Sequence, residues 1–240
     1  MKESVNSQIP MILDMTKDTS IALAGSLVIL NRGFSMLIVG ICGSPKTDGS
    51  STHFLLEKAL AAISDVDTML LDISDYKINH CTGCDSCVRK KPCPQSANDD
   101  MPKIEEKLIN ANGIIIAAPS YFTSVPGVLK DFIDRSRAMK MNDTQLKDTV
   151  FGAITYAGLR YGGQEHVIDV LNRYALAQGM IVVGSVGNPV KHGNFGSGSL
   201  QTDAGSWRSV KEDELAVKGS ELLGKRVEEI VKRLQNSGDE

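Results

Sequence analysis

The chain has little of what marks several large classes of protein. It lacks any hydrophobic run of the roughly 18 residues that a membrane-spanning helix needs, and its most apolar stretch, Ile21–Leu30, contains glycine and serine. Its 26 basic and 29 acidic residues nearly balance, which gives no electrostatic reason to expect nucleic acid or a membrane as partner. It also lacks a Gly-x-Ser-x-Gly elbow, paired carboxylates suited to glycoside chemistry, and a metal-binding pattern among its histidines, His53, His80, His166 and His192.

Cysteine is scarce and unevenly placed. Four of the five cysteines fall between Cys81 and Cys93, too close together for a disulfide framework. Reduced thiols and a cytoplasmic location are therefore expected, and the acidic residues Glu3 and Asp14 disfavour a secretory signal at the start of the chain. The fifth cysteine, Cys42, ends an apolar run and reads as a buried strand residue.

Short apolar runs alternate with helical patterns from Met36 onward, as in a parallel sheet covered by helices. The predicted strands are Met36–Cys42, Thr68–Asp72, Gly113–Ala117, Val150–Thr155 and Met180–Ser185. The predicted helices are Thr52–Ile63, Ile104–Ile109 with a start near Asp99, Gly127–Met139, Gln164–Gln178 and Asp213–Leu234. The fold class is therefore α/β, a doubly wound five-stranded parallel sheet with the flavodoxin-like order 2-1-3-4-5.

The pattern predicts a single folded domain. Residues 1–35 are expected to be an N-terminal extension outside the core fold, and residues 36–240 to form one flavodoxin-like, FMN-binding domain that contains the cysteine loop 80–94. No internal repeat is visible. The glycine-rich segment 188–208 is too long for a plain turn, and is expected either to cover the active site or to be a disordered loop.

The loop after the first strand has the composition of a phosphate site. Backbone N–H groups and the positive end of the following helix would stabilise an anion there. The loop lacks the Gly-Lys-Ser/Thr ending of a P-loop and the Gly-x-Gly-x-x-Gly spacing of a dinucleotide site, so a monophosphate fits better. An ordinary serine-capped turn is the alternative. The predicted ligand contacts in this loop are Ser44, Lys46, Ser50, Ser51 and Thr52.

Two further loops follow the third and fourth strands, where ligands of such sheets bind. The first is rich in aromatic, hydroxyl and proline residues that suit a wall against a flat ring, although core aromatics beside a proline-capped helix would look similar. Its predicted contacts are Pro119, Ser120, Tyr121, Phe122, Thr123 and Ser124. The second contains glycines that permit close backbone approach to a ligand, and its predicted contacts are Tyr156, Gly158, Arg160, Gly162 and Gly163.

The cysteine spacing Cys81-x-x-Cys84-x-x-Cys87-x-x-x-x-x-Cys93 places four thiolates in one short loop. It is similar to the bacterial ferredoxin run, including the proline after the last cysteine, and predicts one 4Fe-4S cluster with these four ligands. Tetrahedral zinc is the alternative, although its two Cys-x-x-Cys arms are usually further apart. Basic residues inside the loop would offset the negative charge of a cluster, or would form a solvated face: Arg89, Lys90 and Lys91.

With these motifs the chain resembles the iron-sulfur flavoproteins of anaerobic archaea and bacteria, a branch of the NAD(P)H-dependent FMN reductase-like group. Besides the cysteine motif, the resemblance rests on four segments: Gly43–Lys46, Ser120-Tyr121 with Leu129–Arg135, Gly162–Glu165 and Leu223–Arg226. Where the family often has Asn-Thr in the phosphate loop, this chain has Ser50-Ser51, which leaves individual phosphate contacts open.

The resemblance implies a redox enzyme that binds one FMN and one 4Fe-4S cluster per subunit. It implies homo-oligomers, a dimer or tetramer, with ferredoxin or a similar small carrier as partner. Because flavin and cluster do the chemistry, no catalytic side chain is predicted. Two alternatives stay open: an NAD(P)H-dependent FMN or quinone reductase with zinc-bound or free cysteines, and a non-enzymatic module with a zinc-held loop.

Overall fold

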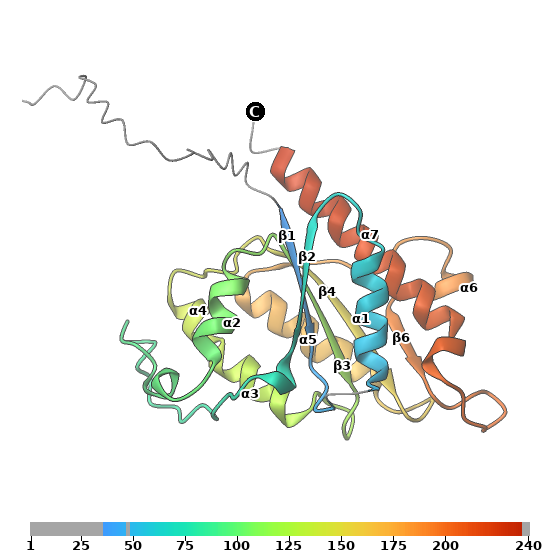
Figure 1. Cartoon of the computed structure of the whole chain (residues 1–240), viewed down its shortest axis with the longest axis horizontal. Helices are drawn as coiled ribbons and strands as arrows, with labels where there is room; N and C mark the ends of the chain where they lie inside the picture. Colours follow the sequence, from blue (N-terminus) through green and yellow to red (C-terminus); the bar gives the residue numbers. More distant parts are fainter. Residues whose placement is uncertain (1–35, 47–48, 237–240) are drawn as a thin grey trace, which may run out of the picture. The chain divides into compact units, whose positions relative to one another are not determined.

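The computed structural model describes residues 36–46 and 49–236. It contains a parallel sheet of β1 (Leu37–Cys42), β2 (Asp67–Asp72), β3 (Gly113–Pro119), β4 (Val150–Ala157), β5 (Ile181–Val182) and β6 (Gly196–Ser199). The order is β2-β1-β3-β4-β5, with β6 also paired to β4 (Figure 1). The predicted flavodoxin-like order 2-1-3-4-5 is confirmed. The prediction for residues 1–35 lies outside the described residues.

Helices cover both faces of the sheet, because its central strands are apolar on both sides. All eight residues of β4 are buried. On one face lie α1 (Ser51–Ala61) and α7 (Glu214–Asn236), and on the other α2 (Met101–Leu108), α3 (Gly127–Arg135) and α5 (Gln164–Gln178), as Figure 1 shows. Each face has its own apolar core. No helix in the described ranges has the length and apolar character to cross a membrane.

The predicted helix over residues 127–139 is divided at Ser136. In its place the chain forms α3 and a short α4 (Arg137–Met141). The Ser136 hydroxyl donates to the carbonyl of Ile133 at 2.7 Å, and the Gln178 amide donates to the Ser136 carbonyl at 3.2 Å. The Gln178 amide competes for the Ser136 carbonyl, whose helical bond from the Lys140 N–H is long, at 3.4 Å.

The last edge of the sheet differs from the prediction. The expected strand Met180–Ser185 is limited to β5, which pairs only with Val150 and Phe151. After α6 (Pro189–His192) the chain returns as β6, which pairs with residues Ile154–Ala157 of β4. Segment 188–208 is therefore partly a strand. A Cβ atom on Gly198 would lie 2.7 Å from that of Ala216, so glycine lets α7 pack closely on β6.

Candidate functional site

Three of the loops singled out from sequence lie side by side at the carboxyl edge of the sheet. They follow β1, β3 and β4, which are consecutive neighbours. Since neighbouring strands are about 4.8 Å apart, the outer two of these strands are about 10 Å apart. The loops meet at the lower edge of the sheet in Figure 1, so one ligand can reach all three.

The first loop holds its own hydroxyl groups in place. The Ser50 side chain caps α1 by accepting from the His53 backbone N–H at 3.4 Å, and its oxygen lies 2.8 Å from that of Thr52. The buried Ser44 hydroxyl accepts from the Lys46 N–H at 3.1 Å. Ser50 occupies the N–H of His53, so the N–H groups of Ser51 and Thr52, which precede the helical hydrogen-bond pattern, are the ones that an anion can use.

The second loop is a tight turn with an unusual backbone. Tyr121 and Ser124 exchange backbone hydrogen bonds of 2.9 and 3.0 Å around Phe122 and Thr123, whose φ angles are 47° and 62°. Non-glycine residues rarely adopt these left-handed angles, and residues that do so are more frequent at ligand sites than elsewhere. The Phe122 side chain is fully exposed at the tip.

The third loop is organised by Gln164, which sequence reasoning placed only as a helix start. Its side chain accepts from the Gly162 N–H at 2.9 Å and donates to the carbonyls of Leu159 and Gly198 at 2.9 and 3.2 Å. The Ser120 hydroxyl of the second loop donates to the Gly162 carbonyl. The second and third loops are thus held together as one unit.

A cavity of about 650 Å³ adjoins these two loops. It is lined by four of the predicted contact residues or their neighbours, Thr123, Arg160, Tyr161 and Gly163. Its other wall comes from β6 and the segment after it, which the sequence did not indicate: Ser197, Ser199, Gln201 and Arg208. Tyr156 is the predicted contact that the structure turns away from this edge. Its ring is buried in the core and its hydroxyl donates to the Ser199 carbonyl at 2.9 Å.

Replacing Gly163 with alanine is expected to weaken flavin binding at least about tenfold and to destabilise the fold by about 1–3 kcal/mol. Gly163 has φ 88°, and a Cβ atom there would lie 2.6 Å from the Thr123 Cα. The second and third loops would be forced apart. Flavin fluorescence on titration into the apoprotein measures the affinity, with Gly179→Ala as the control, because Gly179 has nearly the same φ, 87°, at the other end of α5. Equal flavin affinities in Gly163→Ala and in the control variant would contradict this prediction.

The cysteine loop is closed at its base by an ion pair between Arg135 and Asp99. Both side chains are buried, and the Arg135 guanidinium also donates to the Asn79 carbonyl at 3.0 Å and the Ser96 hydroxyl at 3.2 Å. Asp99 in turn accepts from the Asn79 N–H at 3.1 Å. Burial opposes the charge of Asp99, but the hydrogen bonds from Arg135 and Asn79 hold its pKa below the usual value. The two ends of the loop are thus fastened to α3.

All four predicted metal ligands surround one small hollow. Cys81, Cys84, Cys87 and Cys93 line it with Arg135 and Arg137. None of the four is in a disulfide. Hydrogen bonding by Ser86 lowers the pKa of Cys84, which favours the thiolate that a metal ligand must be. The loop folds back around Cys84 because Gly83 and Asp85 have φ angles of 64° and 55°.

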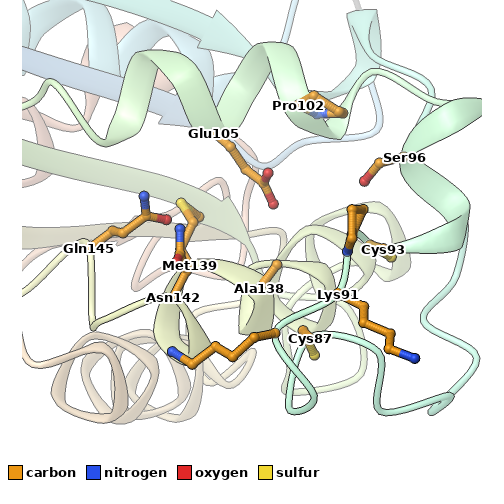
Figure 2. Close-up of a pocket in the computed structure, with 12 residues that line it drawn as sticks. Cys87, Lys91, Cys93, Ser96, Pro102, Glu105, Ala138, Met139, Asn142 and Gln145 are labelled. Carbon is orange, nitrogen blue, oxygen red and sulfur yellow. The ribbon is translucent and has the colours of Figure 1, made fainter. Parts of the chain in front are cut away.

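Arg135 of α3 and Arg137 of α4 add positive charge beside this hollow. Asp85, with Cys87 and Cys81 nearby, raises the pKa of Arg137, whose guanidinium lies 2.8 Å from the Asp85 carboxylate. Arg89 instead donates to the Cys84 carbonyl, and Lys90 bonds to the carbonyl of Met141 and to Asp143. The Lys91 side chain extends outward (Figure 2).

A second cavity, of about 390 Å³, lies on the other side of Cys87 and Cys93. Figure 2 shows Glu105 reaching into it from α2, opposite Asn142 and Gln145. Burial raises the pKa of Glu105. The cysteine loop therefore has a polar cavity on its inner side.

Sequence comparison finds close relatives over most of the chain. A model of the NADPH-dependent FMN reductase family matches residues 36–194. An iron-sulfur flavoprotein of Archaeoglobus fulgidus is 39% identical over 84% of this chain and 98% of its own length. One from Methanocaldococcus jannaschii is 35% identical over 83% of this chain and all of its own length. An iron-sulfur flavoprotein of Methanosarcina thermophila is 30% identical over 85% of this chain and all of its own length.

Structural comparison supports the same fold. RosB with a bound riboflavin-phosphate intermediate superposes with a TM-score of 0.66 at 15% identity, covering 84% of this chain and 81% of RosB. An FMN-dependent NADH-azoreductase from Bacillus anthracis, in complex with FMN, superposes with a TM-score of 0.52 at 16% identity, covering 83% of this chain and 99% of its own. At these identities the likeness concerns the fold alone.

Proposed function

The chain belongs to the NADPH-dependent FMN reductase family and, within it, to the iron-sulfur flavoproteins, and we propose that it passes electrons between a 4Fe-4S cluster and FMN. Family membership confirms the resemblance stated from sequence and the prediction of an oxidoreductase. A non-enzymatic module is accordingly disfavoured. The observation that carries the proposal is the hollow lined by all four loop cysteines beside two arginines.

The three loops support an FMN site. The N–H groups of Ser51 and Thr52 at the start of α1 would bind the phosphate, with the hydroxyls of Ser50 and Thr52 beside them. The second and third loops would orient the ring, with Ser120 and Gln164 fixing their backbones. The exposed Tyr121 and Phe122 rings offer flat apolar surface for it.

The cysteine hollow supports a cluster more than zinc. Four thiols from one loop are the ligand set of a cubane, and the arginines beside them would offset the negative charge that such a cluster carries. When both cofactors are bound, FMN exchanges one or two electrons and the cluster one, so together they couple single-electron carriers to two-electron substrates. The described residues would position both cofactors, and the proposed transfer needs no acid, base or nucleophile from the chain.

The two proposed sites lie at opposite ends of α3. Pro126 of the flavin edge precedes this helix and Arg135 of the cysteine hollow ends it, about 14 Å apart for nine residues. We therefore propose transfer in a homo-oligomer, a dimer or tetramer, in which a neighbouring subunit shortens the path. Exposed Phe122 and Tyr161 at the flavin edge support such an interface.

We further propose ferredoxin or a similar acidic carrier as the redox partner, in the cytoplasm. The exposed cations Arg89 and Lys91 on the cysteine loop suit an acidic surface, and unpaired cysteines suit a reducing compartment. The competing function is an NAD(P)H-dependent FMN or quinone reductase. Rapid flavin reduction by NAD(P)H without a protein carrier would favour it.

An absorption spectrum with metal, sulfide and flavin analysis of anaerobically purified protein tests the proposal. We expect one FMN and about four iron and four sulfide per chain. Ferredoxin reduced by dithionite should then bleach both chromophores. Zinc in place of iron would leave only the flavin reductase alternative, and the absence of both flavin and iron would refute the proposal.

Replacing Arg137 with glutamine is expected to lower the midpoint potential of the cluster. Removal of a positive charge beside the thiolates disfavours the added electron, and about 59 mV corresponds to a tenfold change in the ratio of reduced to oxidised cluster. A shift of a few tens of millivolts is expected, measured by EPR-monitored redox titration. Arg173→Gln removes the same charge on α5, where Arg173 pairs with Asp169, and should leave the potential unchanged. Equal shifts of the midpoint potential in Arg137→Gln and Arg173→Gln would contradict this prediction.

A further inference from the structure

A group of three side chains, of which only Cys42 is fully buried, lies behind the first loop, away from the cysteine hollow. Cys42 ends β1, Asp72 ends β2 as its register partner, and His53 lies in the first turn of α1. The Cys42 Sγ, a His53 ring nitrogen and an Asp72 carboxylate oxygen all lie within 4.8 Å of one another. Sequence reasoning left Cys42 as a strand residue and found no histidine pattern, because these residues are far apart in the chain.

Thiolate, imidazole and carboxylate are the three ligand types of protein zinc sites. Ligand distances of about 2.0–2.3 Å place tetrahedral ligands about 3.3–3.8 Å apart. His53 Nδ1 and Asp72 are 2.9 Å apart, a hydrogen-bond distance, so an ion between them requires these two side chains to part by about 0.4 Å. The donors therefore converge on a point that one small cation can occupy.

A fourth residue supports the metal-binding orientation of His53. Its other nitrogen, Nε2, lies 3.4 Å from the Glu57 carboxylate, one helical turn further along α1. Histidines that bind metals almost always donate the second ring N–H to a carboxylate or carbonyl, which fixes the ring and raises its basicity. Glu57 occupies this position.

We propose that Cys42, His53 and Asp72 form a second metal site of this protein, one that binds a single Zn²⁺, with water as the fourth ligand. Side chains that are 29% exposed at His53 and 16% at Asp72 leave a path for ion and water. Burial raises the pKa of the Cys42 thiol to about 11, so zinc must displace its proton to solvent on binding. The ion ties β1, β2 and α1 together directly beneath the first loop.

The competing arrangement is a metal-free hydrogen-bond network centred on Asp72. His53 donates to Asp72 at 2.9 Å, and the Cys42 thiol also interacts with it. Such a network needs no ion. The two arrangements differ in zinc affinity, and neither depends on the proposed electron transfer.

The test titrates Zn²⁺ into anaerobically purified full-length protein after chelation of loosely bound metal, with iron and flavin measured in the same samples. One zinc per chain is expected with the iron content unchanged. His53→Gln, at a partly exposed position that tolerates substitution, and Cys42→Ala should each weaken binding at least about tenfold. His166→Gln, an exposed histidine on α5, is the matched control and should bind as the wild type does.

Co²⁺ in place of Zn²⁺ identifies the ligands. A thiolate-to-cobalt absorption band that disappears in Cys42→Ala and persists in Cys84→Ser supports the proposal. No zinc binding in the wild type, equal binding in His53→Gln, or a band that follows Cys84 instead of Cys42 would each overturn it.

Discussion

Replacement of Cys84 with serine is expected to reduce the iron content and the cluster EPR signal to near zero while the flavin content stays unchanged. Cys84 is exposed, so serine removes a ligand without disturbing packing. Three thiolates hold a four-iron cluster poorly, and hydroxyl is a weak substitute. The flavin loops lie beyond the other end of α3 and share no contact with Cys84 in the hydrogen bonds of the described chain.

Iron and sulfide assays beside the flavin spectrum measure this outcome. Cys42→Ser is the matched control, because Cys42 lies in β1 outside the hollow and should keep the iron. If Cys84→Ser kept its iron and potential, the cluster assignment would be wrong. If both variants lost iron, a general folding defect would explain the loss.

Replacement of Arg135 with alanine is expected to lower the free energy of unfolding by about 3–5 kcal/mol, since it leaves the buried Asp99 carboxylate unpaired. Arg135 is 3% exposed and bonds to both ends of the cysteine loop. The loop should then become sensitive to protease and lose its iron. Urea unfolding of the protein, with protease mapping of residues 79–99, measures both effects.

The pH dependence of this variant separates charge from packing. The pKa of Asp99 is lowered in the folded protein, so the stability from the pair is fully present above the unfolded pKa of about 3.9 and is lost as pH falls through the folded value. The difference between wild type and Arg135→Ala should therefore shrink below about pH 4. Arg137→Ala breaks a pair whose side chains are about half exposed, so it should lower the free energy of unfolding much less than Arg135→Ala does. Similar losses in both variants would contradict a buried anchor.

The sheet was predictable because its central strands are unbroken apolar runs. Val150–Ala157 and Gly113–Pro119 are buried along most of their length. The sequence pattern of such strands does not depend on which helices cover them. The edge strand β6 could not be predicted, since Gly196–Ser199 consists of glycine and serine. It joins the sheet only because α7 packs against it. The break at Ser136 likewise depends on Gln178, a residue distant in sequence.

The candidate sites also include parts that could be predicted from the sequence and parts that could not. Topology placed the three loops correctly, because residues after neighbouring parallel strands must meet at one edge. The arginines beside the cysteines and the group around Cys42 were missed, because each pairs residues that no local spacing connects. The role of Gln164 was hidden for a related reason: its side chain folds back on the loop before it.

The closure of the cysteine loop by one guanidinium has an evolutionary consequence. Asn79 and Asp99 are brought together on the same arginine, so the chain enters and leaves this segment at almost the same place. A change in the length of the segment between them would therefore leave β2 and α2 in place, whereas removal of the whole segment would leave the buried Arg135 without the carboxylate that offsets its charge. A relative that lacks this segment is expected to lack the arginine as well.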